Sequence, residues 1–300
     1  VKAFPEYPLA THDSVGGRVS VTVGGVARNM AENFSRLGCQ ATLLSAVGTD
    51  VFGRYILDTT STAGVMTEHV LSVPDATTAT YVGVLDAQGL PRYGIFDGRI
   101  FDHISVSYLS QNITALHEAD LLVTQVNLSV ETIQFIADYA ARQCIPFYVN
   151  ATTASLAKRV FTVIDQSPII SANQLEAESL FDTNIQVPDD AVRMASELVH
   201  RGASIAIITL GHLGVAFSDS AGNAFFRPAF QARPIETTGA GDALAATFLA
   251  SVLRGKGHDE SLNDASAAAA LTVESRYSVS PTLDVNTVLE RRTQASDVSK

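Results

Sequence analysis

The chain has 300 residues, of which 46% are hydrophobic and only 17% are charged, with a formal net charge of -11. This length and apolar content support one large buried core, and they exclude disordered and fibrous proteins. The negative charge argues against nucleic-acid polymers and anionic membrane surfaces as partners, because both need a basic patch. We therefore expect a single domain over residues 1–300.

No stretch of the chain reaches the roughly 18 consecutive apolar residues that a membrane span needs. A basic-then-apolar signal pattern is also missing from the first residues, so we expect a cytoplasmic protein. Cys39 and Cys144 stand far apart, without the spacing of zinc ligands. Their separation predicts two buried, unpaired thiols.

The first hundred residues show the alternating and glycine-punctuated pattern of antiparallel ribbons, over residues 17–25 and 76–96. Between these ribbons, residues 26–38 have the spacing of an amphipathic helix and end on a glycine. We expect the ribbons to form a small β lid at the edge of a larger α/β body. The lid segments are expected within about residues 12–25 and 77–100.

From residue 120 onward, short runs that are apolar on both faces alternate with longer amphipathic segments. Apolar runs of this kind form parallel strands that helices cover on both sides. The pattern therefore predicts a parallel sheet between helices. The expected strands are residues 120–126, 146–151, 168–173 and 203–211, and the expected helices are residues 130–143, 175–181 and 189–202.

The most informative motif is Glu-Thr-Thr-Gly-Ala-Gly-Asp-Ala-Leu at residues 236–244, which an apolar helical pattern follows. A glycine turn that leads into a helix leaves backbone N–H groups unpaired, and the helix dipole adds positive charge there. Gly239 and Gly241 allow close approach of an anion, and Asp242 can accept a proton from an attacking hydroxyl. The competing interpretation is an ordinary capping aspartate after loop glycines.

A second motif is Asn173-Gln-Leu-Glu176, at the junction between an expected strand and an expected helix. Amide and carboxylate oxygens at the carboxyl edge of a strand suit Mg²⁺, which keeps several waters and uses few protein ligands. Asn173 and Glu176 are therefore candidate metal-organising residues. The same spacing also describes a capping box, in which Asn begins the helix and Glu follows three residues later.

Two further motifs contain glycines next to polar side chains. Thr209, Gly211 and Gly214 follow an apolar strand, where ligands of open α/β sheets bind, and they are candidates for nucleotide binding. A glycine hairpin is the alternative interpretation. Near the N-terminus, Gly24 and Gly25 precede Asn29, and bare backbone with an amide side chain suits a hydroxyl-rich ligand. A simple loop before a helix competes with this interpretation.

In this order and spacing, the four motifs resemble those of the ribokinase-like, phosphofructokinase B-type carbohydrate kinase family. Residues 24–38 resemble the first signature of the family, residues 236–244 the second, and residues 171–181 and 209–215 two intermediate motifs. The resemblance therefore spans nearly the entire chain. It implies an α/β fold: a ribokinase-like three-layer α/β/α sandwich with a mostly parallel central sheet and a small β-sheet lid.

The resemblance also implies a role for each motif residue. Asp242 would be the general base, beside an anion hole for the transferred phosphate. The other implied roles are the anion hole at Gly239, Ala240 and Gly241; phosphates and Mg²⁺, through water, at Asn173 and Glu176; ATP at Thr209, Gly211 and Gly214; and the sugar at Gly24, Gly25 and Asn29.

Residues 24–33, 96–109, 269–275 and 278–283 are most similar to family members that act on pseudouridine. The implied reaction transfers the γ-phosphate of ATP to the 5′-hydroxyl of that nucleoside, with Mg²⁺ as cofactor. The resemblance leaves open a monovalent cation such as K⁺ and a homodimer that forms through the lid. The alternatives are another sugar or nucleoside kinase of the ribokinase or adenosine kinase type, and a catalytically silent nucleotide-binding relative.

The chain departs from the family pattern at three places. Glu236 stands where the second signature usually has Asp, a change expected to affect the cation loop. Asn150 occupies a position that Asp often holds. The family fold begins with an apolar strand that carries a sugar-binding Asp, and Val1 stands just past the expected end of that strand.

Overall fold

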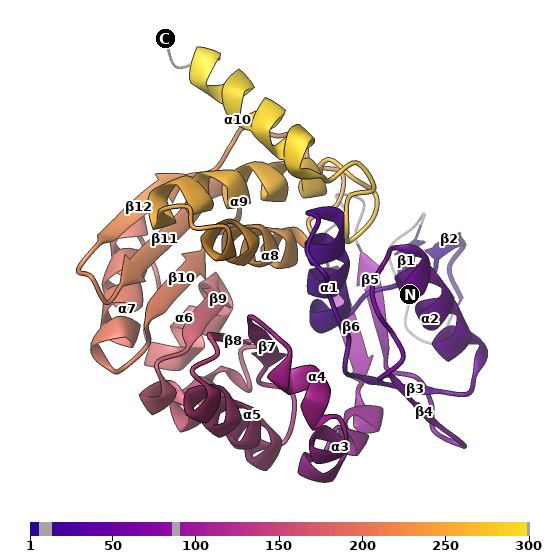
Figure 1. Cartoon of the computed structure of the whole chain (residues 1–300). Helices are drawn as coiled ribbons and strands as arrows, with labels where there is room; N and C mark the ends of the chain where they lie inside the picture. The colour runs from indigo at the N-terminus through magenta and orange to yellow at the C-terminus, as the bar shows by residue number, and fades with distance from the viewer. Residues whose placement is uncertain (6–13, 86–90, 299–300) are drawn as a thin grey trace.

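The centre of the computed structural model, which describes residues 1–5, 14–85 and 91–298, is a six-stranded sheet (Figure 1). Strands β7 to β10 run parallel, and β11 and β12 continue the sheet antiparallel at one edge. The strands follow the order β12-β11-β10-β9-β8-β7. Their bounds are β7 (Leu122–Gln125), β8 (Phe147–Asn150), β9 (Ile169–Asn173), β10 (Ile205–Thr209), β11 (Gly214–Asp219) and β12 (Ala224–Pro228).

Helices cover both faces of this sheet, so the body has three layers (Figure 1). One face packs against α1, α8 and α9, with α10 outside α9, and the opposite face packs against α5, α6 and α7. The bounds of these helices are α1 (Val26–Arg36), α5 (Val130–Gln143), α6 (Gln174–Phe181), α7 (Pro188–His200), α8 (Ala240–Leu253), α9 (His258–Val273) and α10 (Val285–Val298).

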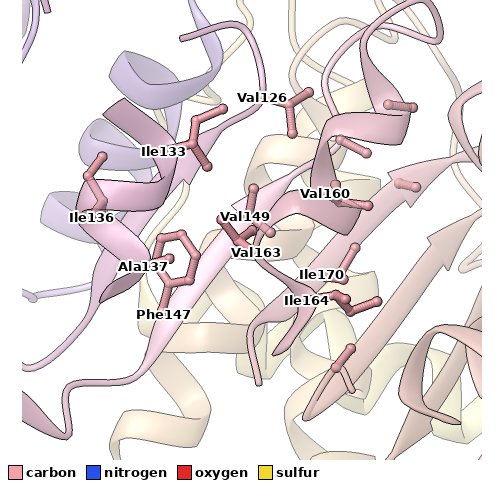
Figure 2. Packing of buried hydrophobic residues seen from close by; sticks show 14 of the residues in the cluster. Val126, Ile133, Ile136, Ala137, Phe147, Val149, Val160, Val163, Ile164 and Ile170 are labelled. Carbon is pink, nitrogen blue, oxygen red and sulfur yellow. The ribbon is translucent and has the colours of Figure 1, made fainter. Parts of the chain in front are cut away.

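Alternation along each strand decides which of the two cores a side chain enters. In β8, Phe147 and Val149 join the core beneath α5, whereas Tyr148 between them joins the opposite core. Ile133 and Ala137 of α5, which are four residues apart and share one helix face, belong to the same core as Phe147 (Figure 2). The strand and helix alternation predicted from residue 120 onward is confirmed, because its apolar runs are buried on both sides.

A second sheet of four strands forms the lid beside α1, in the order β2-β1-β5-β6 (Figure 1). The expected antiparallel pairing of β5 with β6 is present, and β1, a strand that the sequence pattern did not indicate, joins β2 to β5. Residues 12–13 and 86–90 of the expected lid segments lie outside the described residues. The bounds are β1 (Lys2–Pro5), β2 (Gly17–Ser20), β5 (Thr80–Leu85) and β6 (Pro91–Asp97).

Short elements connect the lid to the body. A parallel pair of strands stands apart from both larger sheets, and α2 lies between its two members in the chain. These elements are β3 (Ala46–Gly48), α2 (Val51–Thr62), β4 (Leu71–Val73), α3 (Val106–Gln111) and α4 (Ile113–His117), with a 3₁₀-helix at Arg99–His103. Three further 3₁₀-helices lie within the body, at Ala157–Thr162, Ile164–Gln166 and Gly211–Leu213.

The expectation of two buried thiols is wrong, since Cys144 is exposed and Cys39 is half-buried. Cys144 ends α5 in a left-handed conformation, and this helix end lies at the surface where the chain turns toward β8. Among the helices of the described ranges, none has the length and apolar content needed to cross a membrane.

Candidate active site

The turn before α8 holds the glycines predicted to bind an anion. Gly239 is the N-cap of α8 with a φ of 89°, a left-handed conformation that glycine adopts without strain. A Cβ at this position would lie 1.9 Å from the carbonyl oxygen of Ser278, so the packing admits only glycine. Helix geometry leaves the N–H groups of Gly241 and Asp242 without helical partners. These groups and the helix dipole favour an anion at the turn.

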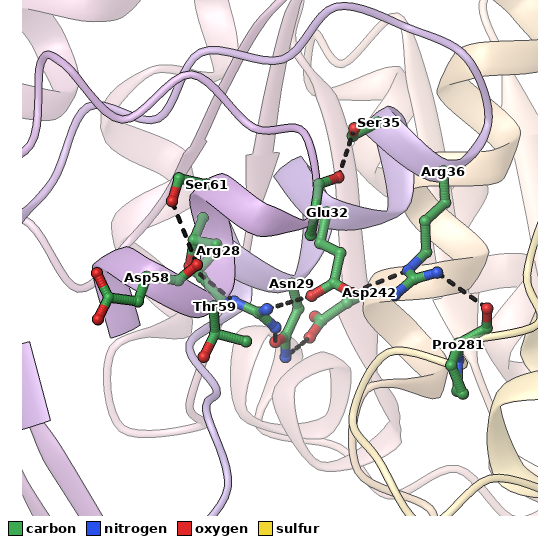
Figure 3. Close-up of polar contacts among 12 residues, drawn as sticks. Arg28, Asn29, Glu32, Ser35, Arg36, Asp58, Thr59, Ser61, Asp242 and Pro281 are labelled. Carbon is green, nitrogen blue, oxygen red and sulfur yellow. Dashed lines mark hydrogen bonds and ion pairs between the residues drawn. The ribbon is translucent and has the colours of Figure 1, made fainter. Parts of the chain in front are cut away.

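Asp242 lies in the first turn of α8, and its side chain is buried. Its Oδ2 accepts a hydrogen bond of 2.8 Å from Nδ2 of Asn29 on α1 (Figure 3). Burial raises the pKa of Asp242 to about 7; the negative charge of Glu176 adds to this rise, and the hydrogen bond from Asn29 opposes it. A carboxylate that titrates near neutral pH is suited to act as a general base.

A cavity of about 1400 Å³ lies between α1, the lid and β7. Gly24, Gly25 and Asn29 border it on one side, and Gly239 and Asp242 border it on another. The structure therefore brings the predicted sugar-binding residues and the predicted catalytic residues into one chamber, although 213 positions separate Asn29 from Asp242.

Several residues that the sequence analysis did not single out also line this cavity. Gln125, Asn127 and Thr152 lie just at or beyond the carboxyl ends of β7 and β8, and Tyr81 and Phe96 reach it from the lid. Ligands of open α/β sheets bind beyond the carboxyl ends of the strands, and this rule alone points to the first three residues.

Asn173 and Glu176 form the capping box that was the alternative to a metal site. The Asn173 side chain accepts from the Glu176 N–H at 3.0 Å, and Oε2 of Glu176 accepts from the Asn173 N–H at 2.8 Å. The other oxygen, Oε1, accepts from the N–H of Thr153 at 3.0 Å. In the part of the chain that the structure describes, no three His, Cys, Asp or Glu residues gather as a metal cluster. Both carboxylate oxygens of Glu176 are thus already bonded to backbone N–H groups.

Thr209 lies beside Asn173, because the two residues are register partners at the carboxyl ends of β10 and β9. Gly211 begins a 3₁₀ turn, and Gly214 begins β11, which returns antiparallel to β10. The glycine hairpin interpretation is therefore correct for the backbone. None of these three residues lines the cavity described above, and they lie at the carboxyl ends of β9 and β10 or just beyond them.

An ion pair joins the lid to the glycine turn before α8. Lys2 on β1 places its Nζ 2.6 Å from Oε2 of Glu236, and Oε1 of Glu236 accepts from the hydroxyl of Thr238 at 2.7 Å. Burial opposes ionisation of Glu236, but the hydrogen bonds from Lys2 and Thr238 lower its pKa overall. Lys2 also donates to the hydroxyl of Thr238 at 3.4 Å. Glu236, which departs from the family pattern, is thus one of two residues of the turn that this lid lysine contacts.

These features define a class of α/β proteins in which a glycine turn at a helix N-terminus lies beside a buried carboxylate, next to a β lid. The profile of the pfkB family carbohydrate kinases matches residues 5–285. The chain therefore belongs to the pfkB family, as the four motifs indicated.

Known proteins agree with this assignment. The chain is 31% identical to the pseudouridine kinase of Escherichia coli K12, over 96% of this chain and 92% of that protein. The structure of Arabidopsis thaliana ribokinase complexed with ribose and ATP superposes with a TM-score of 0.84 at 20% identity, covering 97% and 95% of the two chains. A ribokinase II from E. coli in complex with ATP and Mg²⁺ gives 0.82 at 17%, covering 98% and 96%. The expected ribokinase-like fold is confirmed.

Proposed function

We propose that this enzyme transfers the γ-phosphate of ATP to the 5′-hydroxyl of pseudouridine. The observation that carries the proposal is the position of Asp242, buried at the wall of the cavity and one turn from the glycine N-cap of α8. The similarity to the E. coli pseudouridine kinase supports the choice of acceptor. The acceptor binds in the cavity, and ATP binds at the carboxyl ends of β9 and β10.

The chemistry requires one proton transfer and one phosphoryl transfer. Among the described residues, Asn29 alone hydrogen-bonds the Asp242 carboxylate, at Oδ2, so Oδ1 can accept the proton of the 5′-hydroxyl. The oxygen of that hydroxyl forms a bond to the γ-phosphorus, while the bond from this phosphorus to the bridging oxygen of ADP breaks. The free N–H groups of Gly241 and Asp242 would face the negative charge that spreads over the transferred oxygens. The predicted amide of Ala240 is not available in the same way, because its N–H donates to the carbonyl oxygen of Thr237 at 3.4 Å.

The donor set at β9 fits a magnesium ion held through water. Both oxygens of Glu176 already accept a backbone N–H, which leaves lone pairs for metal-bound water but not an open carboxylate. Glu176 and Asn173 would hold the ion there, and it would neutralise phosphate charge when bound. The nucleotide would contact Thr209, Gly211 and Gly214. A monovalent cation such as K⁺ would bind near the loop that contains Glu236, just before α8.

The lid completes the site. Tyr81 and Phe96 face the cavity, where they would exclude water that could otherwise accept the phosphate.

The opposite face of the lid offers a surface for a second copy of the chain. The register of the lid sheet places Val19 and Tyr93 on this face, where each side chain is 65% exposed, with Ile95 at 72%. We propose that this apolar face pairs in a homodimer.

Pseudouridine is expected to be the preferred acceptor in a coupled ATP-consumption assay against uridine, adenosine and ribose. Its N1–H is a donor that uridine lacks, and a site built for such a group discriminates by about tenfold or more in kcat/KM. Equal kcat/KM values for pseudouridine and uridine would contradict the choice of acceptor but leave the kinase assignment intact. Turnover with ribose but with none of the three nucleosides would favour a ribokinase. A ribokinase is the second candidate because the fold is similar to that of the Arabidopsis ribokinase. No ATP turnover with any acceptor would favour a silent relative.

Replacing Lys2 by Met is expected to lower kcat/KM for ATP by about fivefold, because the glycine turn before α8 loses the ion pair that links it to the lid. Steady-state kinetics with ATP varied would measure the change. Arg18→Met is the matched control: it removes a positive charge from β2, where the guanidinium lies 4.5 Å from the Phe4 ring. An equal loss in both variants would show that lid charge in general matters, and not this pair.

A further inference from the structure

Helix α1 buries an unusual number of polar side chains where it packs against α8. Arg28, Asn29 and Glu32 are 6%, 3% and 5% exposed. Burying charged and amide groups is costly unless each has partners, so their contacts indicate what the site requires. Arg28 and Glu32 form an ion pair, and Arg36 donates to the other oxygen of Glu32 at 2.8 Å (Figure 3).

The guanidinium of Arg28 reaches three different partners. Its Nε donates to the hydroxyl of Thr60 on α2 at 3.2 Å, and one terminal nitrogen pairs with Glu32. The remaining terminal nitrogen, Nη1, donates to Oδ1 of Asn29 at 3.3 Å. Because arginine has only donors in a fixed planar fork, these partners hold the guanidinium in one orientation.

This contact decides which way the Asn29 amide points. With Oδ1 facing the guanidinium, Nδ2 faces Asp242 and donates to it. The reversed amide would place an oxygen against the Asp242 carboxylate and an NH₂ group against Arg28, and both contacts would be repulsive. Arg28 therefore selects the amide orientation that holds Oδ2 of Asp242 and leaves Oδ1 facing the acceptor.

We propose that Arg28 is a positioning residue for catalysis, which acts through Asn29 to orient the Asp242 carboxylate. The inference rests on the proposed role of Asp242 as general base. It assigns Asn29 to the base as well as to the sugar, since one N–H of its amide is committed to Asp242 and the other remains for an acceptor hydroxyl.

Ionisable groups on several elements face this arrangement and must be considered in any test that varies pH. Glu176 on α6 and Tyr148 on β8 interact with Asp242 through charge. Arg28 interacts in the same way with Glu32 and Arg36 of α1 and with Tyr55 of α2. Substitutions at Asn29 or Arg28 leave Glu176 and Tyr148 unchanged. Since the hydrogen bond from Asn29 lowers the pKa of Asp242, its loss raises that pKa and moves the acid limb of kcat toward alkaline pH.

The test is a double-mutant cycle with Arg28→Met, Asn29→Ala and the combined variant. We expect Asn29→Ala to lower kcat about fivefold at pH 7 and to move the acid limb by about one pH unit, which is the effect of losing one hydrogen bond to a charged group. Arg28→Met is expected to act in the same direction and to a smaller extent. The combined variant should be no worse than Asn29→Ala, because the two residues act in series.

Two further variants separate positioning from folding. Arg36→Met also removes a partner of Glu32 but does not contact Asn29, so its acid limb should match the wild type. Arg28→Lys keeps the positive charge opposite Glu32 without the planar fork, and it carries the test if Arg28→Met does not fold.

Four results would overturn the proposal. The first three are losses that multiply in the combined variant, a change confined to KM for the acceptor, and an equal shift of the acid limb in Arg36→Met. The variant Asp242→Asn separates the proposed role of Asp242 as general base from the positioning role of Arg28. Near-wild-type turnover of that variant would refute the base assignment itself, whereas an inactive Asp242→Asn with an unshifted Asn29→Ala would refute only the positioning role.

Discussion

Asp242→Asn is expected to lower kcat by about 10²- to 10⁴-fold, which corresponds to about 3–5 kcal/mol of activation free energy. The amide has nearly the same shape as the carboxylate and can still accept the hydrogen bond from Asn29, but it cannot take a proton from the acceptor hydroxyl. ATP should bind to the variant as it does to the wild type, because the predicted nucleotide residues lie outside the cavity that Asp242 borders. Single-turnover kinetics and nucleotide titration measure the two effects separately.

The same substitution is expected to stabilise the fold, and the pH dependence of this gain has a definite sign. The pKa of Asp242 rises from 3.8 to about 7 on folding, so the folded state disfavours the ionised carboxylate. The resulting penalty is absent below the unfolded pKa, grows as pH rises from about 4 to 7, and is constant above that range. At 1.36 kcal/mol for each pH unit, it reaches at most about 4 kcal/mol. Asp242→Asn should therefore raise the unfolding temperature more at pH 8 than at pH 5.

Asp219 provides a control with the opposite sign. This aspartate is also buried, but hydrogen bonds from Asn223 and His258 overcome the effect of burial and lower its pKa. Its ionised form stabilises the fold above the unfolded pKa, so Asp219→Asn should lower the unfolding temperature at neutral pH.

Equal turnover of Asp242→Asn and the wild type would contradict the assignment of Asp242 as general base. A loss of stability in Asp242→Asn would contradict the argument that burial disfavours the ionised carboxylate.

The layered body could be predicted from the sequence because its signals are local. Phe147 to Val149 are apolar on both strand faces, which indicates a strand between two helical layers, and the structure places them there. The turn at Gly239 and the base candidate at Asp242 follow one another in the chain, so their spacing alone predicts an anion site at a helix N-terminus.

The contacts that complete the site are not local, and the sequence pattern did not indicate them. Lys2 forms an ion pair with Glu236, and Asn29 donates a hydrogen bond to Asp242. The members of each pair are far apart in the sequence, and only the folded chain brings them together. Strand β1 was missed because four residues are too few for a reliable alternation pattern. Asn173 and Glu176 show the reverse problem, since one local spacing is compatible with both a capping box and a water-mediated metal site.

Gly239→Ala is expected to destabilise the protein by about 3 kcal/mol or more and to abolish most of its activity. The new Cβ would lie 1.9 Å from the carbonyl oxygen of Ser278, and the backbone φ of 89° is strained for any residue with a side chain. The clash is relieved only if the glycine turn or the loop that contains Ser278 moves. Either shift displaces the amides proposed to face the phosphate. Denaturant unfolding and steady-state kinetics measure the two losses.

Gly241→Ala separates the anion site from the fold within the same motif. A Cβ at Gly241 meets no atom within 4 Å, and alanine in a helix is favoured over glycine, so stability should change by less than about 1 kcal/mol. The added methyl group would stand where the phosphate approaches the amide, so kcat should still fall. Loss of activity without loss of stability in Gly241→Ala, beside loss of both in Gly239→Ala, would place the phosphate at this turn. Full activity of Gly241→Ala would place it elsewhere, because an anion in van der Waals contact with the bare backbone cannot accommodate the extra carbon.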